Sequence, residues 1–243
     1  MLKEFIEKIE EMAQKENTQT FDIYGRKYST EQLFEIKKQY DQPDLVTLNT
    51  LESLADIIKI ELSKAYQPLF INVISPTVVR VFTTYHHDEN SRREHLYAAQ
   101  AELPNIKLND YLEHENFMIA LRSKFVENED VEYLLNLLRK ISDKNSVESE
   151  DNGVTQTVQA WKGVVMVENV AVRPKVKLAP FRTFLEVEQP ESEFLLRLQE
   201  GGRIGLFEAD GGAWKLDAKE RVKDLLQELL REEIAAGKVV VIA

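Results

Sequence analysis

Three of the four histidines in this chain of 243 residues lie in one short stretch. The stretch Tyr85–His95 reads YHHDENSRREH and contains His86, His87 and His95, and the fourth histidine, His114, follows soon after. Imidazole and carboxylate groups are common ligands of zinc and iron, and acidic side chains are interleaved with these histidines. The cluster is therefore a candidate metal site, which would suit a metal-dependent hydrolase or nuclease.

The spacing of the histidines limits the metal sites that they can form. Adjacent His86 and His87 would point to opposite faces of a strand, so one site could use only one of them there. No HExxH motif is present, so a composite site needs the fold to bring His86 or His87 together with His95 and His114. The alternative, which the sequence favours, is an exposed hairpin tip that contacts a partner. The residues of that predicted contact are His86, His87, Asp88, Arg92 and Arg93.

Paired carboxylates in the stretch EVEQPESE could act as a general acid and a general base. Glu186 and Glu188 would share one face of a strand predicted over residues 174–188, which is the geometry of a two-carboxylate catalyst. The same geometry describes a solvent-exposed strand face in a chain with 42 acidic residues. The pattern fits both a two-carboxylate catalyst and an exposed strand face, and we predict no catalytic residue.

A glycine pair and two arginines are candidate binding elements for phosphate or another anion. A phosphate loop needs a glycine-rich turn that opens directly onto a helix. Asp210-Gly211-Gly212 is followed instead by a strand predicted over residues 212–216, so we predict a hairpin turn and no cofactor. Arg182 and Arg197 lie on predicted antiparallel strands and could bind an anion, but pairing with the abundant acids is the favoured interpretation.

Hydrophobic periodicity indicates which elements would hold these residues. Alternating apolar residues predict strands over 68–75, 77–85 and 94–103, so YHHDENSRREH falls in the turn between two strands. Upstream, the patterns predict helices over 2–16, 29–40 and 51–62, a hairpin over 21–29 and a short strand over 45–48. Asn49 or Thr50 is the predicted N-cap of the third helix.

The second half of the chain combines a helical segment with a β-rich remainder. Helical spacing covers residues 109–143, with Asp130 as a cap after a turn or break at ENED. Strands are predicted over 154–162, 164–172, 174–188, 193–199, 203–208 and 212–216. An amphipathic helix between the cap Asp217 and the stop Gly237 precedes a final strand, KVVVI.

Runs of strands and runs of helices without strict alternation predict an α+β fold. We expect an antiparallel β-rich domain with a central long helical segment and amphipathic helices at both ends. Residues 1–43 are interpreted as an N-terminal helix and small hairpin that serve as an assembly arm. Residues 44–243 are interpreted as a single α+β domain with an internal joint at 142–153. Two alternatives stay open for the N-terminal helix: it packs on its own chain, or it packs on a neighbouring subunit.

Composition excludes several classes of function. The net charge of -11 repels phosphate backbones, so broad nucleic-acid binding is not expected. The absence of cysteine excludes disulfides and thiolate catalysis and fits a cytoplasmic protein. No stretch approaches the roughly 18 apolar residues that a membrane helix needs, so no membrane partner is expected.

Four stretches of the chain carry a family resemblance: DLVTLNTLESLADII, VVRVFTTYHHDENSRREHLYAAQAELP, NFMIALRSKFVENEDVEYLLNLLRKI and PFRTFLEVEQPESEFLLRLQEGGRIGLFEADGGAW. They resemble motifs of the YfdQ-like family of tailed-phage and prophage proteins. The resemblance covers most of the chain from about residue 44 onward. It implies a phage or prophage accessory protein in the bacterial host cytoplasm, and no catalytic residue. The order of elements is also similar to the shell fold of phage capsids and encapsulins, which is an alternative by fold analogy.

The leading hypothesis is a non-enzymatic protein that acts by self-assembly or protein binding. Its expected partners are other copies of itself, or a phage or host protein. The first alternative is the metal-dependent hydrolase or nuclease that would use His86, His87, His95 and His114. A further alternative is an anti-defence sink for a host nucleotide signal.

Overall fold

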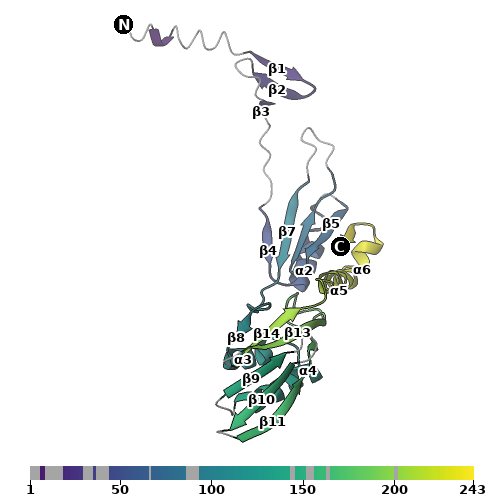
Figure 1. Cartoon of the computed structure of the whole chain (residues 1–243). Helices are drawn as coiled ribbons and strands as arrows, with labels where there is room; N and C mark the ends of the chain where they lie inside the picture. The colour runs from purple at the N-terminus through teal and green to yellow at the C-terminus, as the bar shows by residue number, and fades with distance from the viewer. Residues whose placement is uncertain are drawn as a thin grey trace. The chain divides into compact units, whose positions relative to one another are not determined.

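The computed structural model shows an α+β fold, as the sequence predicts. The chain divides into two compact units: unit 1 comprises residues 1–44 and 84–94, and unit 2 comprises residues 45–83 and 95–243. Figure 1 gives the labels of the elements. The structure describes residues 6–8, 19–29, 35–36, 44–65, 67–85, 93–142, 146–151, 156–162, 165–199 and 202–243.

Unit 1 contains a three-stranded antiparallel sheet of β1 (Thr20–Ile23), β2 (Arg26–Ser29) and β3 (Glu35–Ile36). Tyr24 and Gly25 connect β1 to β2, with φ angles of 54° and 77°. Two consecutive residues with positive φ match the twist of a hairpin, so a two-residue turn closes the pair. The hairpin predicted over residues 21–29 is confirmed.

Two helix predictions fall in unit 1. The helix predicted over residues 29–40 is wrong at residues 35–36, because these residues form β3 and pair with β2. Strand pairing overrides a local helical pattern of this length. Residues 6–8 are helical, and the rest of the helix predicted over 2–16 lies outside the described residues.

Unit 2 begins with a five-stranded sheet in the order β15-β5-β6-β7-β4. Its bounds are β4 (Val46–Leu48), β5 (Leu69–Ser75), β6 (Val78–Phe82), β7 (His95–Gln100) and β15 (Val239–Ile242). The three central strands pair antiparallel, as predicted, whereas β4 and β15 run parallel to their neighbours. The chain leaves β4 and reaches β15 through helices, which allows parallel pairing.

Helices cover one face of this five-stranded sheet, here called the inner face. They are α2 (Leu51–Glu61) and α5 (Trp214–Leu229), with the short α6 (Arg231–Ala235) after them. Alternate strand residues meet these helices in the first hydrophobic core, among them Leu69, Ile71, Val73, Val79 and Val81. The period of two places the intervening residues on the opposite face, here called the outer face. These are Phe70, Asn72, Ile74, Val78, Arg80 and Phe82.

A second hydrophobic core lies between a four-stranded antiparallel sheet and two helices. The sheet has the order β12-β13-β14-β8. Its bounds are β8 (Tyr111–Leu112), β12 (Lys175–Leu178), β13 (Ser192–Gln199) and β14 (Arg203–Glu208). The helices are α3 (His114–Lys124) and α4 (Glu129–Ser142). A separate antiparallel sheet contains β9 (Ser146–Asp151), β10 (Gln156–Lys162) and β11 (Val165–Val172).

The central helical segment differs from the prediction in two places. Helix begins at His114 instead of residue 109, because β8 pairs with β14. It breaks after α3, where Phe125 forms a bridge with Pro180. Asn128, and not Asp130, caps α4, since its Oδ1 accepts a hydrogen bond of 2.9 Å from the N–H of Val131.

The start of α5 also differs from the prediction. The strand predicted over residues 212–216 is wrong, because helix begins at Trp214. Asp210 holds this start, since its carboxylate accepts hydrogen bonds from the N–H groups of Gly212 and Trp214 at 3.0 and 3.3 Å. Asp217, the predicted cap, lies inside the helix. Gly237 has a φ of 70° after the last helical turn and is the predicted stop.

The strand predicted over residues 174–188 ends early, at Leu178. Residues 179–191, here called the linking segment, form no strand. Within it, the carboxylate of Glu186 accepts hydrogen bonds from the N–H groups of Leu51 and Glu52 at 3.0 and 2.9 Å. Together with the predicted N-cap Thr50, which accepts from Ser53, this carboxylate satisfies the first turn of α2.

Glu186→Ala should lower the free energy of unfolding by about 1–2 kcal/mol, because two N–H groups at the positive end of α2 lose a charged acceptor. Urea unfolding followed by circular dichroism measures the change. Glu127→Ala is the matched control, since that exposed carboxylate has no hydrogen bond or ion pair in the described part of the chain. Equal stability of the two variants would rule out a capping role for Glu186.

Candidate functional site

The structure describes only part of the histidine cluster. His86, His87, Asp88 and Arg92 lie outside the described residues, so the predicted partner contact stays a prediction. His95 is the first residue of β7 and lies opposite Phe82 of β6, with 5.9 Å between the ring centroids. The prediction that the cluster lies between two strands of a hairpin is confirmed.

The other histidines do not form a metal site within the described residues. His114 begins α3, and its Nε2 lies 2.9 Å from the carbonyl oxygen of Leu138 in α4. His95 lies in the five-stranded sheet, whereas His114 lies in a helix that packs on the four-stranded sheet. Among the described residues, no three His, Asp or Glu side chains are grouped in a way that could hold a metal ion. Arg93 lies with its Cζ 5.9 Å from the ring centroid of Tyr85.

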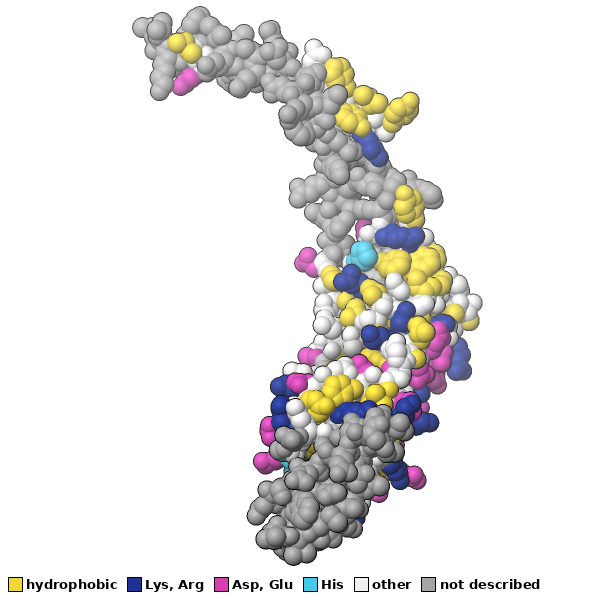
Figure 2. Space-filling model, viewed as in Figure 1, with side chains coloured by type: hydrophobic (Ala, Val, Ile, Leu, Met, Phe, Trp, Pro, Cys, Tyr) yellow, Lys and Arg dark blue, Asp and Glu magenta, His cyan; other side chains and the backbone are white. Residues whose placement is uncertain are grey.

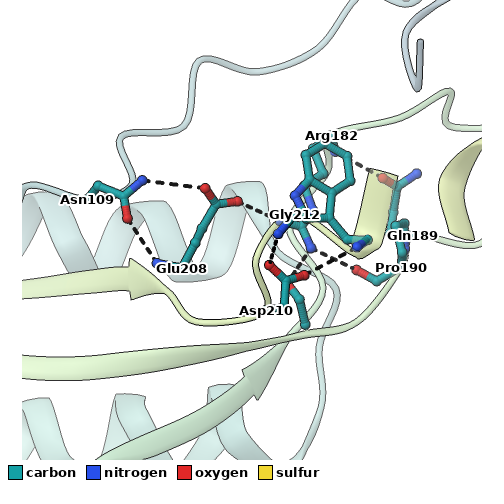
Figure 3. Close-up of polar contacts among 9 residues, drawn as sticks. Asn109, Arg182, Gln189, Pro190, Glu208, Asp210 and Gly212 are labelled. Carbon is teal, nitrogen blue, oxygen red and sulfur yellow. Dashed lines mark hydrogen bonds and ion pairs between the residues drawn. The ribbon is translucent and has the colours of Figure 1, made fainter. Parts of the chain in front are cut away.

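The densest polar cluster in the described structure surrounds Arg182 of the linking segment (Figure 3). Arg182 is only 8% exposed. Its Nη1 donates to Glu208 at 3.1 Å, and its Nη2 donates to the carbonyl oxygen of Pro190 at 3.4 Å and to the hydroxyl of Ser192. The guanidinium lies over the indole of Trp214, 3.9 Å from the ring centroid. Because a buried charge needs such partners, these contacts define the position of the linking segment.

The side chain of Gln189 forms hydrogen bonds with backbone groups of the linking segment, to which it itself belongs. Its Oε1 accepts hydrogen bonds from the N–H groups of Arg182 and Thr183 at 3.0 and 3.2 Å. Its Nε2 donates to the carbonyl oxygens of Phe184 and Val187 at 3.0 and 3.2 Å. The linking segment can be buried without strand pairing because this side-chain amide provides hydrogen bonds that a neighbouring strand would otherwise provide.

Two chain connections between the cores of unit 2 meet at this cluster beside the linking segment, which itself joins β12 to β13 of the four-stranded sheet. Residues 101–110 and 209–213 pass beside the linking segment, and Asn109 joins the first connection to Glu208. The Oδ1 of Asn109 accepts from the N–H of Glu208 at 2.9 Å, and its Nδ2 donates to the carboxylate at 3.4 Å. Asp210 in the second connection caps α5. We call Asn109, Arg182, Gln189, Glu208 and Asp210 the junction cluster.

The charges at the junction cluster favour a structural role for Arg182 over a role in anion binding. Burial lowers the pKa of Arg182 to about 10, while the charges of Glu208 and Asp210 raise it. The group therefore stays charged at neutral pH, and protein acceptors occupy both of its terminal nitrogens. The favoured interpretation of Arg182, pairing with an acid, is confirmed. Arg182 lies on no strand, and Arg197 lies on β13.

The candidate carboxylates are occupied in structural contacts. Glu186 caps α2, and Glu188 forms an ion pair of 2.8 Å with Arg221 of α5. They lie on no common strand face, so the predicted geometry of a two-carboxylate catalyst is wrong. The prolines at 180 and 190 were the signal that could have shown this, because proline is excluded from central strands.

A shallow pocket of about 400 Å³ lies beside Trp214. Its acidic side chains are committed to other groups: Glu193 pairs with Lys175 at 2.8 Å, and Asp217 pairs with Arg221 at 3.0 Å. The glycine pair before α5 does open onto a helix, against the prediction. Asp210 already occupies the N–H groups that an anion would need, and its charge repels phosphate.

Arg182→Leu should destabilise unit 2 by about 3 kcal/mol, because Glu208 loses its charged partner and three acceptors lose a donor. Arg182→Lys should recover only part of this, since an ammonium cannot reproduce the planar fork. Urea unfolding measures both variants against Arg122→Leu, which removes an exposed arginine of α3. A loss below about 0.5 kcal/mol for Arg182→Leu would show that the junction cluster is dispensable.

The described part of the chain contains no helix that is long and apolar enough to cross a membrane. Comparison with known proteins finds no matching family model, no similar curated protein and no solved structure of similar fold. The resemblance to the YfdQ-like family and the analogy to capsid shells therefore stay predictions.

Proposed function

We propose that this protein acts by self-assembly, and that the β1–β2 hairpin of unit 1 is the element that binds a second copy. The observation that carries the proposal is the exposure of the hairpin's apolar side chains. Phe21 and Ile23 are 44% and 47% exposed, and Tyr24 is fully exposed. Figure 2 shows hydrophobic side chains gathered on this hairpin.

The arrangement of these side chains suits a docking surface. Phe21 and Ile23 lie two residues apart in β1 and therefore share one face of the hairpin. Tyr28 of β2 pairs with Phe21 and extends the same face. Neither hydrophobic core of the described structure contains a residue of unit 1. Burial of such a side chain contributes about 1.5–3 kcal/mol, so the hairpin holds binding energy that a single copy leaves unused.

The turn itself supports this interpretation. Tyr24 adopts a φ of 54°, a left-handed conformation that costs a residue with a Cβ free energy. A turn of this type is normally formed by Asn-Gly or Asp-Gly. Tyrosine at this place weakens the turn and presents a ring to solvent, and exposed tyrosines are common anchors of protein interfaces. Backbone strain combined with full exposure favours a binding role over a folding role.

A second copy of the chain is the partner that chemistry favours. The hairpin has two basic side chains, Arg26 and Lys27, and one acidic side chain, Asp22, whereas the chain as a whole has a net charge of -11. A locally basic, apolar element is attracted to an acidic surface. Each copy both donates a hairpin and receives one, so every copy takes part in two contacts of this kind.

The proposal includes the setting that the sequence resemblance implies, an accessory protein of a phage or prophage in the bacterial cytoplasm. Support for that setting comes from the motifs quoted above. No observation in the described residues favours the metal-dependent hydrolase or the nucleotide sink.

A variant with Phe21→Thr, Ile23→Thr and Tyr24→Asn tests the proposal. Threonine keeps strand propensity and asparagine suits the left-handed turn position, so the hairpin should form while its apolar surface is lost. Mass photometry of a dilution series at about 1 μM should show multimers of the wild type. The apparent dissociation constant of the variant should be higher by at least about tenfold.

The matched control is the double variant Ile60→Gln and Leu216→Gln, which removes two strongly exposed apolar side chains from α2 and α5. Its assembly should equal that of the wild type. A monomeric wild type at concentrations of about 10 μM, or a hairpin variant that assembles as the wild type does, would refute self-assembly through the hairpin.

A further inference from the structure

The hairpin of unit 1 has one strand edge that no described strand covers. The sheet has the order β1-β2-β3, so β1 lies at an edge, and all four of its residues are exposed. The opposite edge strand, β3, has only two residues. An edge strand presents backbone N–H and C=O groups that can pair with a strand of another chain. The free side of β1 is therefore a candidate interaction surface.

The turn determines which backbone groups of β1 are available. Ile23 and Arg26 flank the two-residue turn, so they exchange backbone hydrogen bonds. Because such pairs alternate along an antiparallel ladder, Phe21 also bonds to β2, whereas the N–H and C=O groups of Thr20 and Asp22 point away from β2. Within the part of the chain that the structure describes, these outward backbone groups form no hydrogen bond.

β1 lacks the features by which proteins normally protect an edge strand, which are lysine, proline and very short length. In unit 2, the edge strand β12 has two exposed lysines, Lys175 and Lys177, and the edge strands β4 and β8 have three and two residues. The one charged residue of β1 is Asp22, and its Oδ1 accepts a hydrogen bond of 3.1 Å from the N–H of Gly25 in the turn. This charge is thus held by its own hairpin.

The spacing of the outward groups permits pairing between two copies of β1. Antiparallel pairing through these groups has three registers: Asp22 opposite Asp22, Thr20 opposite Thr20, or Asp22 opposite Thr20. The first places like charges directly opposite each other, which is destabilising. The second leaves the outward groups of Asp22 without a partner on β1. The third register pairs the outward N–H and C=O groups of both residues in both copies.

The third register has a two-fold axis at Phe21. Phe21 then lies opposite Phe21 of the second copy in a non-hydrogen-bonded pair, where Cα atoms are about 4.5 Å apart and side chains are closest. Aromatic pairs on neighbouring strands stabilise a sheet. Tyr28 of β2 is in register with Phe21, so it extends the same face in each copy. The interface is isologous, and each copy donates and receives the same groups in its two symmetric halves.

Charge does not oppose this pairing. Both basic residues of the hairpin, Arg26 and Lys27, belong to β2, one strand away from the contact. Lys27 is in register with Asp22 and offsets its charge within the same hairpin. Across the contact, Asp22 faces the neutral Thr20 of the second copy. Two chains that each have a net charge of -11 thus meet at a strand with a single, offset charge.

We propose that β1 pairs antiparallel with β1 of a second copy, with Phe21 on the two-fold axis, so that two three-stranded sheets become one six-stranded sheet. This inference rests on the proposed function and adds the surface of the second copy that the hairpin binds. The occupant is a second β1 because its outward groups, its charge and its central aromatic ring complement themselves in one register.

Thr20→Pro tests the edge and leaves the apolar side chains of the hairpin in place. Proline lacks the outward N–H, and its ring hinders a second strand, while the ladder to β2 needs no N–H from residue 20. Mass photometry should show an apparent dissociation constant at least about tenfold above that of the wild type. Thr20→Val keeps the N–H and the branched side chain, so this matched control should assemble as the wild type does.

Disulfide formation tests the register, because the chain contains no cysteine. Residue 21 would lie opposite its own copy at a separation that suits a disulfide, whereas the two copies of residue 23 would lie about 13 Å apart along the strands. Phe21→Cys should therefore form a linked dimer under mild oxidation at least about tenfold faster than Ile23→Cys, measured by non-reducing gel electrophoresis. The two variants are matched, since each removes one apolar side chain from the same face.

The outcomes distinguish this inference from the proposed function. Weaker assembly of Thr20→Pro together with faster linkage at residue 21 supports pairing through β1. If Thr20→Pro assembles as the wild type does, or if Ile23→Cys links as fast as Phe21→Cys, pairing through β1 is overturned while self-assembly through the hairpin stands. If the wild type stays monomeric at about 10 μM, the proposed function fails together with this inference.

Discussion

Burial of the Arg182 guanidinium is the constraint on which the described structure of unit 2 depends. A charge removed from water must have acceptors at fixed positions, and here they come from residues far apart in the sequence. Glu208 is the last residue of β14, Pro190 lies in the linking segment, Ser192 is the first residue of β13, and the indole belongs to α5. Two hydrophobic cores alone would leave the connections between them free to shift. The junction cluster holds those connections in one arrangement.

The same linking segment organises the five-stranded sheet. Once Arg182 and Gln189 hold it, Thr183 donates to the carbonyl oxygen of Pro76 at 2.6 Å, next to the β5–β6 turn. Glu186 reaches the start of α2, and Glu188 reaches Arg221 of α5. Both helices are thereby held at the sheet, where their apolar faces form the first core with its inner face.

Local signals in the sequence were sufficient for the β1–β2 hairpin, for β5, β6 and β7, and for α2. Alternating β-branched residues on both sides of a short turn predict β5, β6 and β7, because strand pairing within a hairpin needs only neighbouring residues. Thr50 was a predictable cap for the same reason. The junction cluster could not be predicted in this way, since Arg182, Glu208 and Trp214 meet only after two cores have formed. The end of β12 and the helical start at Trp214 were missed because apolar alternation and a glycine pair outweighed prolines and the capping residue Asp210 in the sequence pattern.

The central claim of the proposal is that the β1–β2 hairpin becomes buried when copies associate. Hydroxyl-radical footprinting along a dilution series, read by mass spectrometry, measures this directly on the wild-type chain. We expect the oxidation rates of Phe21 and Tyr24 to fall with rising concentration. The rate of Leu216 on α5 should stay constant. Rates of Phe21 and Tyr24 that do not depend on concentration would contradict the account.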